Sequence, residues 1–163
     1  MDIYGVVVFI HATTILLFFI AHGASMAVGF RLKAESDPAR VRALLDLSRF
    51  ALGTPTFVVA GIGLLTGILA GFLGGHWGRL WIWVSLVLFI AIAGAMTPLA
   101  SMRWQPIRAA AGMTTSGPGA IEARPEDPVE LRRLLDAWNP VPIAVVGLTG
   151  FVVILWLMLT KPF

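Results

Sequence analysis

The sequence predicts an all-α integral membrane protein, a four-transmembrane-helix bundle that forms a single domain over residues 1–163. Three observations predict this fold. The chain is 58% hydrophobic and only 13% charged, which is typical of membrane proteins. Four segments are long and apolar enough to cross a bilayer. Two polar loops on one side resemble each other, which indicates two parallel-repeat hairpins with both termini outside.

The four predicted spans each satisfy the length that a bilayer demands. About 20 apolar residues are needed to cross a hydrocarbon core of about 30 Å as a helix. Segments without Asp, Glu, Lys or Arg cover residues 3–30, 52–73, 80–101 and 141–160. Because Met1 and Asp2 precede the first of these instead of a basic segment, we interpret it as a retained span and not as a signal peptide.

Basic residues predict the orientation. Ten of the twelve lie in the loops after the first and third spans, and only Arg79 and Lys161 lie on the other side. The positive-inside rule therefore places both loops in the cytoplasm and both termini outside. Indole rings favour the membrane interface, and tryptophans lie near predicted span ends at Trp77, Trp81, Trp104, Trp138 and Trp156.

The two cytoplasmic loops carry an internal repeat. "DPARVRALLD" (residues 37–46) aligns without a gap with "DPVELRRLLD" (residues 127–136), and Asp, Pro, Arg, Leu, Leu and Asp match. We predict amphipathic helices over 38–49 and 128–138, or cytoplasmic extensions of the spans that follow them. Between them, residues 105–126 are rich in Gly, Pro and small side chains, which predicts a flexible loop.

Both loop helices have recognisable start signals. Asp37 and Asp127 can cap the first free N–H groups, and Pro38 and Pro128 occupy the first helical position, where no donor is needed. Glu130 stands three residues after Asp127, as in a capping box.

Three glycines predict where the second span packs. Gly63, Gly67 and Gly71 recur every four residues and form one smooth face that another helix can approach closely. The partner is the fourth span or another subunit, and we favour the internal one.

Two histidines in the first span are the candidate functional residues. His11 and His22 lie eleven residues apart, so they share a helix face at a separation of about 16 Å. Ionisable residues at this depth suggest a function, and imidazole can ligate haem or handle protons. No intramembrane carboxylate accompanies them, which disfavours a proton relay. The alternative is that each imidazole only donates to a carbonyl or threonine of a neighbouring helix.

A haem b at His11 is five-coordinate or takes a second ligand, for which His76 in "GGHWGR" and Met158 are weak candidates. Copper handling is a third possibility, although the chain has no cysteine. No catalytic residue is assigned, since the sequence has no nucleotide-binding loop or hydrolase nucleophile. No nucleic-acid partner is expected, because the excess of 12 Lys and Arg over 9 Asp and Glu is modest for a membrane protein.

The sequence resembles a bacterial family of predicted integral membrane proteins of unknown function. The residues that carry this resemblance are "FIHATTILLFFIAHG", "LLTG", "ELRRLLDAW" and the ending "LWLMLTKPF". More distantly it is similar to HemJ-type protoporphyrinogen oxidases and to the membrane part of CopD copper-resistance proteins.

HemJ-type chains are four-span haem-b proteins with a first-span histidine, which His11 matches, and a third-span lysine. That lysine would fall at or near Ser85, where this chain has none. The resemblance therefore implies the fold and a haem at His11, but not the oxidase reaction. A haem-binding redox or tetrapyrrole-related protein is the first functional hypothesis. A non-catalytic accessory or oligomerising subunit, with an unidentified protein partner, is the second.

Overall fold

The computed structural model describes residues 2–52, 54–117 and 119–163. Met1, the first residue of the predicted domain, lies outside the described residues, as do Gly53 of the predicted second span and Pro118 of the predicted flexible loop. The described part of the chain contains helices and no strand. In chain order the helices are α1 (Ile3–Ala34), α2 (Pro38–Leu52), α3 (Thr54–Leu73), the short 3₁₀ helix η1 (His76–Gly78), α4 (Leu80–Ala110), α5 (Pro128–Ala137) and α6 (Val141–Thr160).

Four of these helices, α1, α3, α4 and α6, are long and apolar enough to cross a membrane, which confirms the prediction of an all-helical protein with four spans. Two of them are longer than the sequence predicts. α1 continues to Ala34, and α4 continues through Pro106 to Ala110, taking in the first residues of the predicted loop. At 1.5 Å per residue, the 32 residues of α1 reach about 48 Å, well beyond a hydrocarbon core of about 30 Å.

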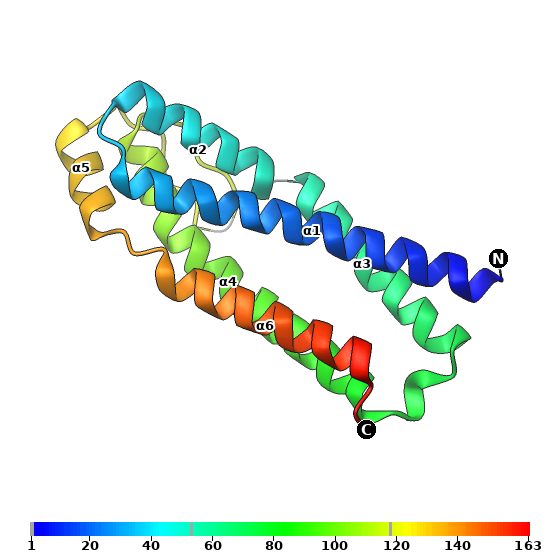
Figure 1. The fold of residues 1–163 in the computed structure, drawn as a ribbon. Coiled ribbons are helices and arrows are strands. Elements are labelled where there is room, and N and C mark those ends of the chain that lie inside the picture. The colour runs from blue at the N-terminus through cyan, green and yellow to red at the C-terminus, as the bar shows by residue number, and fades with distance from the viewer. Residues whose placement is uncertain (1, 53, 118) are drawn as a thin grey trace.

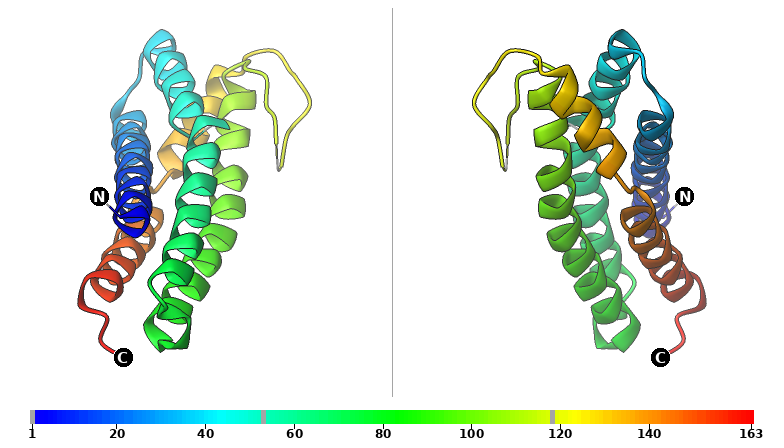
Figure 2. Two further views of the ribbon diagram at one scale, coloured as in Figure 1. Left: turned by 90° about the vertical axis from the view of Figure 1, so that its right-hand side faces the viewer. Right: turned by 90° about the vertical axis from the view of Figure 1, so that its left-hand side faces the viewer.

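The helices form two groups along the chain. α1 packs along α3, with α2 against both, while α4 packs along α6, with α5 against α4. α2 and α5 lie together at one end of the molecule, and both chain ends lie at the other (Figure 1). Figure 2 shows the segment between α4 and α5 projecting from the bundle beside that end. Each long helix therefore runs from the end that holds the termini into a layer built with the shorter helices.

The loop helices begin where the sequence predicts. The Asp127 carboxylate accepts from the backbone N–H groups of Val129 and Glu130 at 3.1 and 3.0 Å, and Asp37 accepts from that of Ala39 at 2.8 Å. Glu130 does not complete a capping box. Its carboxylate pairs with Arg133, because the Asp127 N–H that it would reach donates instead to the carbonyl of Ala110, at 2.9 Å.

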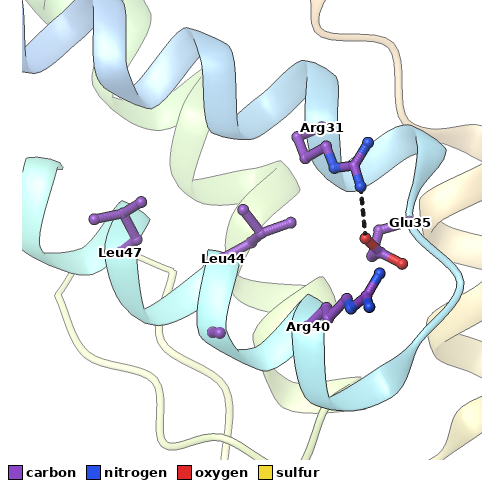
Figure 3. Close-up of a pocket in the computed structure, with 6 residues that line it drawn as sticks. Arg31, Glu35, Arg40, Leu44 and Leu47 are labelled. Carbon is purple, nitrogen blue, oxygen red and sulfur yellow. Dashed lines mark hydrogen bonds and ion pairs between the residues drawn. The ribbon is translucent and has the colours of Figure 1, made fainter.

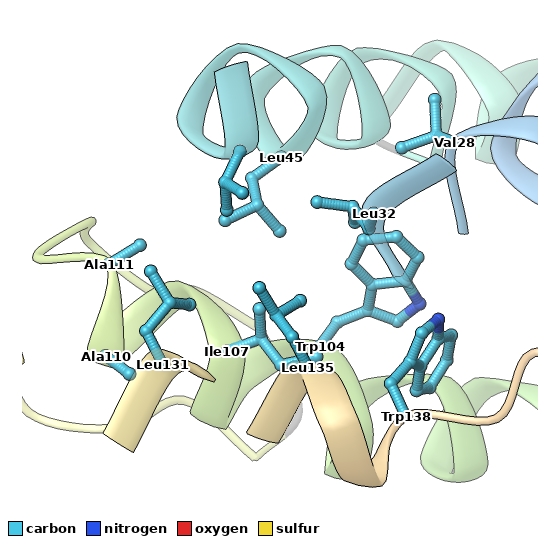
Figure 4. Packing of buried hydrophobic residues seen from close by; sticks show 11 residues of the cluster. Val28, Leu32, Leu45, Trp104, Ile107, Ala110, Ala111, Leu131, Leu135 and Trp138 are labelled. Atoms are coloured by element: carbon cyan, nitrogen blue, oxygen red, sulfur yellow. The ribbon is translucent and has the colours of Figure 1, made fainter. Parts of the chain in front are cut away.

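The main hydrophobic core lies at the end that holds α2 and α5 (Figure 4). It joins the two groups of helices, since its buried residues come from α1, α2, α4, α5 and the residues just after α4 and α5: Val28, Leu32, Val41, Leu45, Trp104, Ile107, Ala110, Ala111, Leu131, Leu135 and Trp138. Trp104 and Trp138 are buried, with ring centroids 5.5 Å apart. They serve as core residues here, where the sequence suggested interfacial indoles.

Candidate ligand site around His11

The imidazole of His11 is held against the backbone of α3. Its Nδ1 lies 2.8 Å from the carbonyl oxygen of Gly63, near the middle of that helix. The same oxygen also accepts from the Thr66 hydroxyl at 3.1 Å. A helical carbonyl is reachable at this point because Gly63 has no side chain to cover it, so the glycine exposes an acceptor as well as a smooth surface.

Gly67, one turn further along α3, lies in close contact with the His11 ring. A Cβ atom built on Gly67 would lie 2.8 Å from Cε1 of His11 and 3.1 Å from Nδ1. A Cβ on Gly63 would meet Thr14 and Ile15 of α1, at 3.3 and 3.2 Å. At these two glycines, the partner of the glycine face is thus α1 and not α6, which differs from the fourth-span partner expected above. The α1 side chains that lie against these two glycines are His11, Thr14 and Ile15.

Gly71, the third glycine of the series, faces a different neighbour. A Cβ there would lie 2.8 Å from Ile82 and 3.1 Å from the Trp77 ring. Gly150 of α6 faces Ile92 of α4. Each of these glycines therefore packs within the chain.

The hydrogen bond to Gly63 determines which ring nitrogen of His11 carries the hydrogen. A carbonyl oxygen only accepts, so Nδ1 carries the hydrogen and donates it. In a neutral imidazole, Nε2 then keeps its lone pair. Within the described residues Nε2 has no hydrogen-bond partner, and it is not among the fully buried atoms without a partner. A lone pair held in a fixed direction by a carbonyl behind the ring is the arrangement of a metal-ligating histidine.

His22 has a more local environment. Its ring lies against that of Phe18, one turn earlier in α1, at a centroid separation of 4.3 Å. Nδ1 is buried and makes no well-formed hydrogen bond to the described residues. Its polar neighbour is the backbone of Phe18. His22 therefore shares a helix with His11 but not its inter-helix hydrogen bond.

His76 lies at the end of the molecule that holds the termini. Its Nε2 is 3.1 Å from the hydroxyl of Tyr4, a partner that the sequence analysis missed because 72 residues separate the two. Burial lowers the pKa of His76, and the charges of Lys161 and Arg79 lower it further. A Cβ on Gly74, the residue after the end of α3, would meet both His76 and Tyr4. Seven residues at 1.5 Å each separate Gly74 from Gly67 by about 10 Å along the helix axis. His76 and His11 therefore do not approach one ligand site.

Met158, the other weak candidate for a second ligand, packs against a small cluster of Trp81, Ile82 and Leu157. The described residues contain no group of three His, Asp or Glu side chains that could hold a metal ion. The structure thus brings together His11, Gly63 and Gly67, but it does not add His22, His76 or Met158 to that group.

Comparison with known proteins identifies the chain at the level of its family. No curated protein and no solved structure matches it. Residues 5–162 match a family model, so the match includes all four spans and the His11 site. With its four apolar helices and this match over nearly the whole sequence, the chain belongs to the family described as "Predicted integral membrane protein (DUF2269)".

Proposed function

We propose that this integral membrane protein binds one haem b, with Nε2 of His11 as an axial ligand, and that it has a redox or tetrapyrrole-related role. The observation that carries the proposal is the hydrogen bond from His11 Nδ1 to the Gly63 carbonyl, which leaves Nε2 as the ligating nitrogen. A bound haem would supply one-electron chemistry.

The residues around His11 fit one axial ligand. Gly63 orients the ring through its carbonyl, and the missing side chain at Gly67 leaves room for the Cε1 side of the ring. Since His76 and Met158 contact other parts of the chain, His11 would be the one protein side chain among these candidates that holds the haem. The carbonyl bond also holds the ring in one orientation, as partners of metal-ligating histidines commonly do.

The test is a visible absorption spectrum of the detergent-purified protein, expressed with haem precursor and measured before and after dithionite reduction. We expect a Soret band and sharpened bands on reduction. His11→Ala should abolish them, whereas His22→Ala should retain them. Gly67→Ala should lower haem occupancy because its methyl group would displace the ring, and Gly61→Ala is the matched control, since a Cβ at Gly61 meets nothing within 4 Å. Full haem occupancy in His11→Ala would overturn the proposal.

A non-catalytic accessory role is the second candidate, and the same contact favours it. The bond between His11 and Gly63 joins α1 to α3, so the imidazole can act as a packing element alone. This candidate predicts a colourless protein that purifies with a partner or as an oligomer. A copper role has weaker support, because two methionines that could ligate copper contact different parts of the chain. Met158 packs against the cluster of Trp81, Ile82 and Leu157, whereas Met96 lies beside Gly147.

We also propose that the chain consists of two copies of one unit, α1–α2–α3 and α4–α5–α6, with α2 and α5 on the cytoplasmic side of a bacterial inner membrane and both termini outside. Support comes from the matching loops, the ten basic residues at that side, and the packing of each long helix with the last helix of its own unit. Fusion of a reporter enzyme to each terminus and to the loop after α4 tests the orientation.

A further inference from the structure

A groove lies between the end of α1 and the first turns of α2. Its volume is about 430 Å³, and it is lined by Arg31, Glu35, Arg40, Ala43, Leu44 and Leu47. Figure 3 shows the two arginines and Glu35 together at one end, with Leu44 next and Leu47 beyond it. The groove is therefore polar at one end and apolar at the other.

The apolar end points toward the membrane. α2 leads directly into α3, which crosses the bilayer, so the order Arg40, Leu44, Leu47 runs from solvent toward lipid. On α1, Arg31 is the first basic residue after a stretch without Asp, Glu, Lys or Arg, which marks where that helix leaves the hydrocarbon. Leu47 is 52% exposed, which leaves its side chain free to cover an acyl chain.

Both arginines keep donors for a ligand. Arg31 donates one N–H to the Glu35 carboxylate at 3.2 Å, and its side chain is 61% exposed. Arg40 lies 3.7 Å from the Asp37 carboxylate and is 69% exposed. A guanidinium has five N–H donors in a planar fork that suits phosphate oxygens. Each side chain can therefore bind a phosphate without giving up its carboxylate.

Glu35 holds the polar end in place. Its carboxylate accepts from the backbone N–H groups of Ser36 and Asp37, at 3.1 and 3.2 Å. The bond from Asp37 contributes most to lowering the pKa of Glu35, and the bond from Ser36 and the charge of Arg31 add to it. Glu35 is thus ionised at neutral pH and positions Arg31. Glu35 and Asp37 balance the charges of Arg31 and Arg40, so a phosphate group would be held by the free guanidinium N–H donors and not by a net positive charge.

We propose that this groove binds one membrane glycerophospholipid, with its phosphodiester between Arg31 and Arg40 and an acyl chain along Leu44 and Leu47. A phospholipid matches the groove in both chemistry and direction, since its headgroup would lie at the solvent end and its chains would point into the bilayer. Free phosphate would occupy only the polar end. The proposal does not depend on haem binding at His11.

The experiment is native mass spectrometry of the delipidated full-length protein in detergent, titrated with dioleoylphosphatidylglycerol. We expect one tightly bound lipid and an increase of at least tenfold in its dissociation constant for the double variant Arg31→Gln/Arg40→Gln. The matched control is Arg133→Gln, which removes an arginine of similar exposure, 71%, that pairs with Glu130 on α5. This control should change the dissociation constant by less than twofold. Circular dichroism checks that each variant is folded.

Two further probes separate the sources of the phosphate. Dioleoylglycerol, which has the chains without the phosphate, and glycerol phosphate, which has the phosphate without the chains, should not bind at the same concentrations. Leu47→Asn should weaken lipid binding without removing a charge. If the double variant does not fold, the dissociation constant of Leu47→Asn tests whether the lipid occupies this groove. The proposal is overturned if no lipid is retained, if Arg133→Gln weakens binding as much as the double variant, or if glycerol phosphate binds equally well.

Discussion

Arg132 of α5 donates a hydrogen bond from Nη1 to the backbone carbonyl of Glu35, just after α1, over 3.3 Å. Arg42 of α2 makes the corresponding bond, from Nε to the carbonyl of Ala111 just after α4, over 3.1 Å. The two arginines occupy the same position in the two aligned loop sequences. Carbonyl groups at a helix end lack partners within the helix, so each group of helices caps the long helix of the other.

Arg132→Met should destabilise the junction between the two groups of helices. The change keeps most of the aliphatic stem but removes the donor to Glu35, and we expect a small decrease in the free energy of unfolding. Denaturant unfolding in detergent micelles measures it. Arg133→Met is the control, because Arg133 pairs only with Glu130 in the same helix among its described ion pairs. An equal loss for both variants would contradict the capping role.

Gly67→Ala should destabilise the contact of α1 with α3, while Gly61→Ala should not. The new methyl group would overlap the His11 ring, so we expect a cost of roughly 1–3 kcal/mol. At Gly61 the site is open, and alanine is the better helix former, so a neutral or slightly favourable effect is expected. Thermal unfolding in detergent compares the two variants. Equal melting temperatures would show that the ring does not lie on Gly67.

Trp138→Phe should weaken the main core. The indole Nε1 donates to the carbonyl of Gly29 over 3.0 Å, and the ring packs against Trp104. Losing the bond and part of the ring should cost roughly 1–3 kcal/mol. Near-ultraviolet circular dichroism should also lose signal from the paired indoles. Trp156→Phe, at a side chain that is 51% exposed, should leave both quantities nearly unchanged.

His76 should make stability depend on pH. Its pKa is lowered in the folded protein, mainly by burial, so the unfolded chain binds its proton more tightly. The contribution of His76 to the free energy of unfolding is therefore at its full value above the ordinary histidine pKa of about 6.5. This contribution decreases as pH falls from there toward the lower pKa of the folded protein. Unfolding measured from pH 7.5 to 5 should show this decrease, and His76→Gln should flatten it. A steeper decrease in His76→Gln would reverse the assigned sign.

Hydropathy and local start signals were sufficient to predict the spans and both loop helices. A stretch of this length without charged residues has few alternatives to a helix in a bilayer, and an Asp-Pro pair followed by apolar residues at helical spacing is typical of a helix start. The end of α4 was not predictable in this way. Arg103 and Pro106 look like the end of a helix, but the burial of Ile107 and Ala110 against α5 keeps the chain helical.

The candidate site was predicted only in part. His11 could be singled out because an imidazole is unusual in a hydrophobic segment. Its hydrogen-bond acceptor is a backbone carbonyl, and because every residue has one, the sequence does not indicate which carbonyl is used. A series of glycines alone does not specify which helix it faces. The bond between Tyr4 and His76 likewise depends on how α1 and η1 come together.

The length of α1 has a mechanical consequence. The helix is unbroken from Ile3 to Ala34, so it connects the membrane to the core around Leu32 as one stiff rod. A tilt of about 10° about its first turn would carry Leu32 sideways by roughly 8 Å. Leu32 is fully buried, so the layer made by α2 and α5 must move with it or resist the tilt. Because Arg31 stands next to Leu32, a tilt of α1 that follows a change in bilayer thickness would act on both the core and the groove.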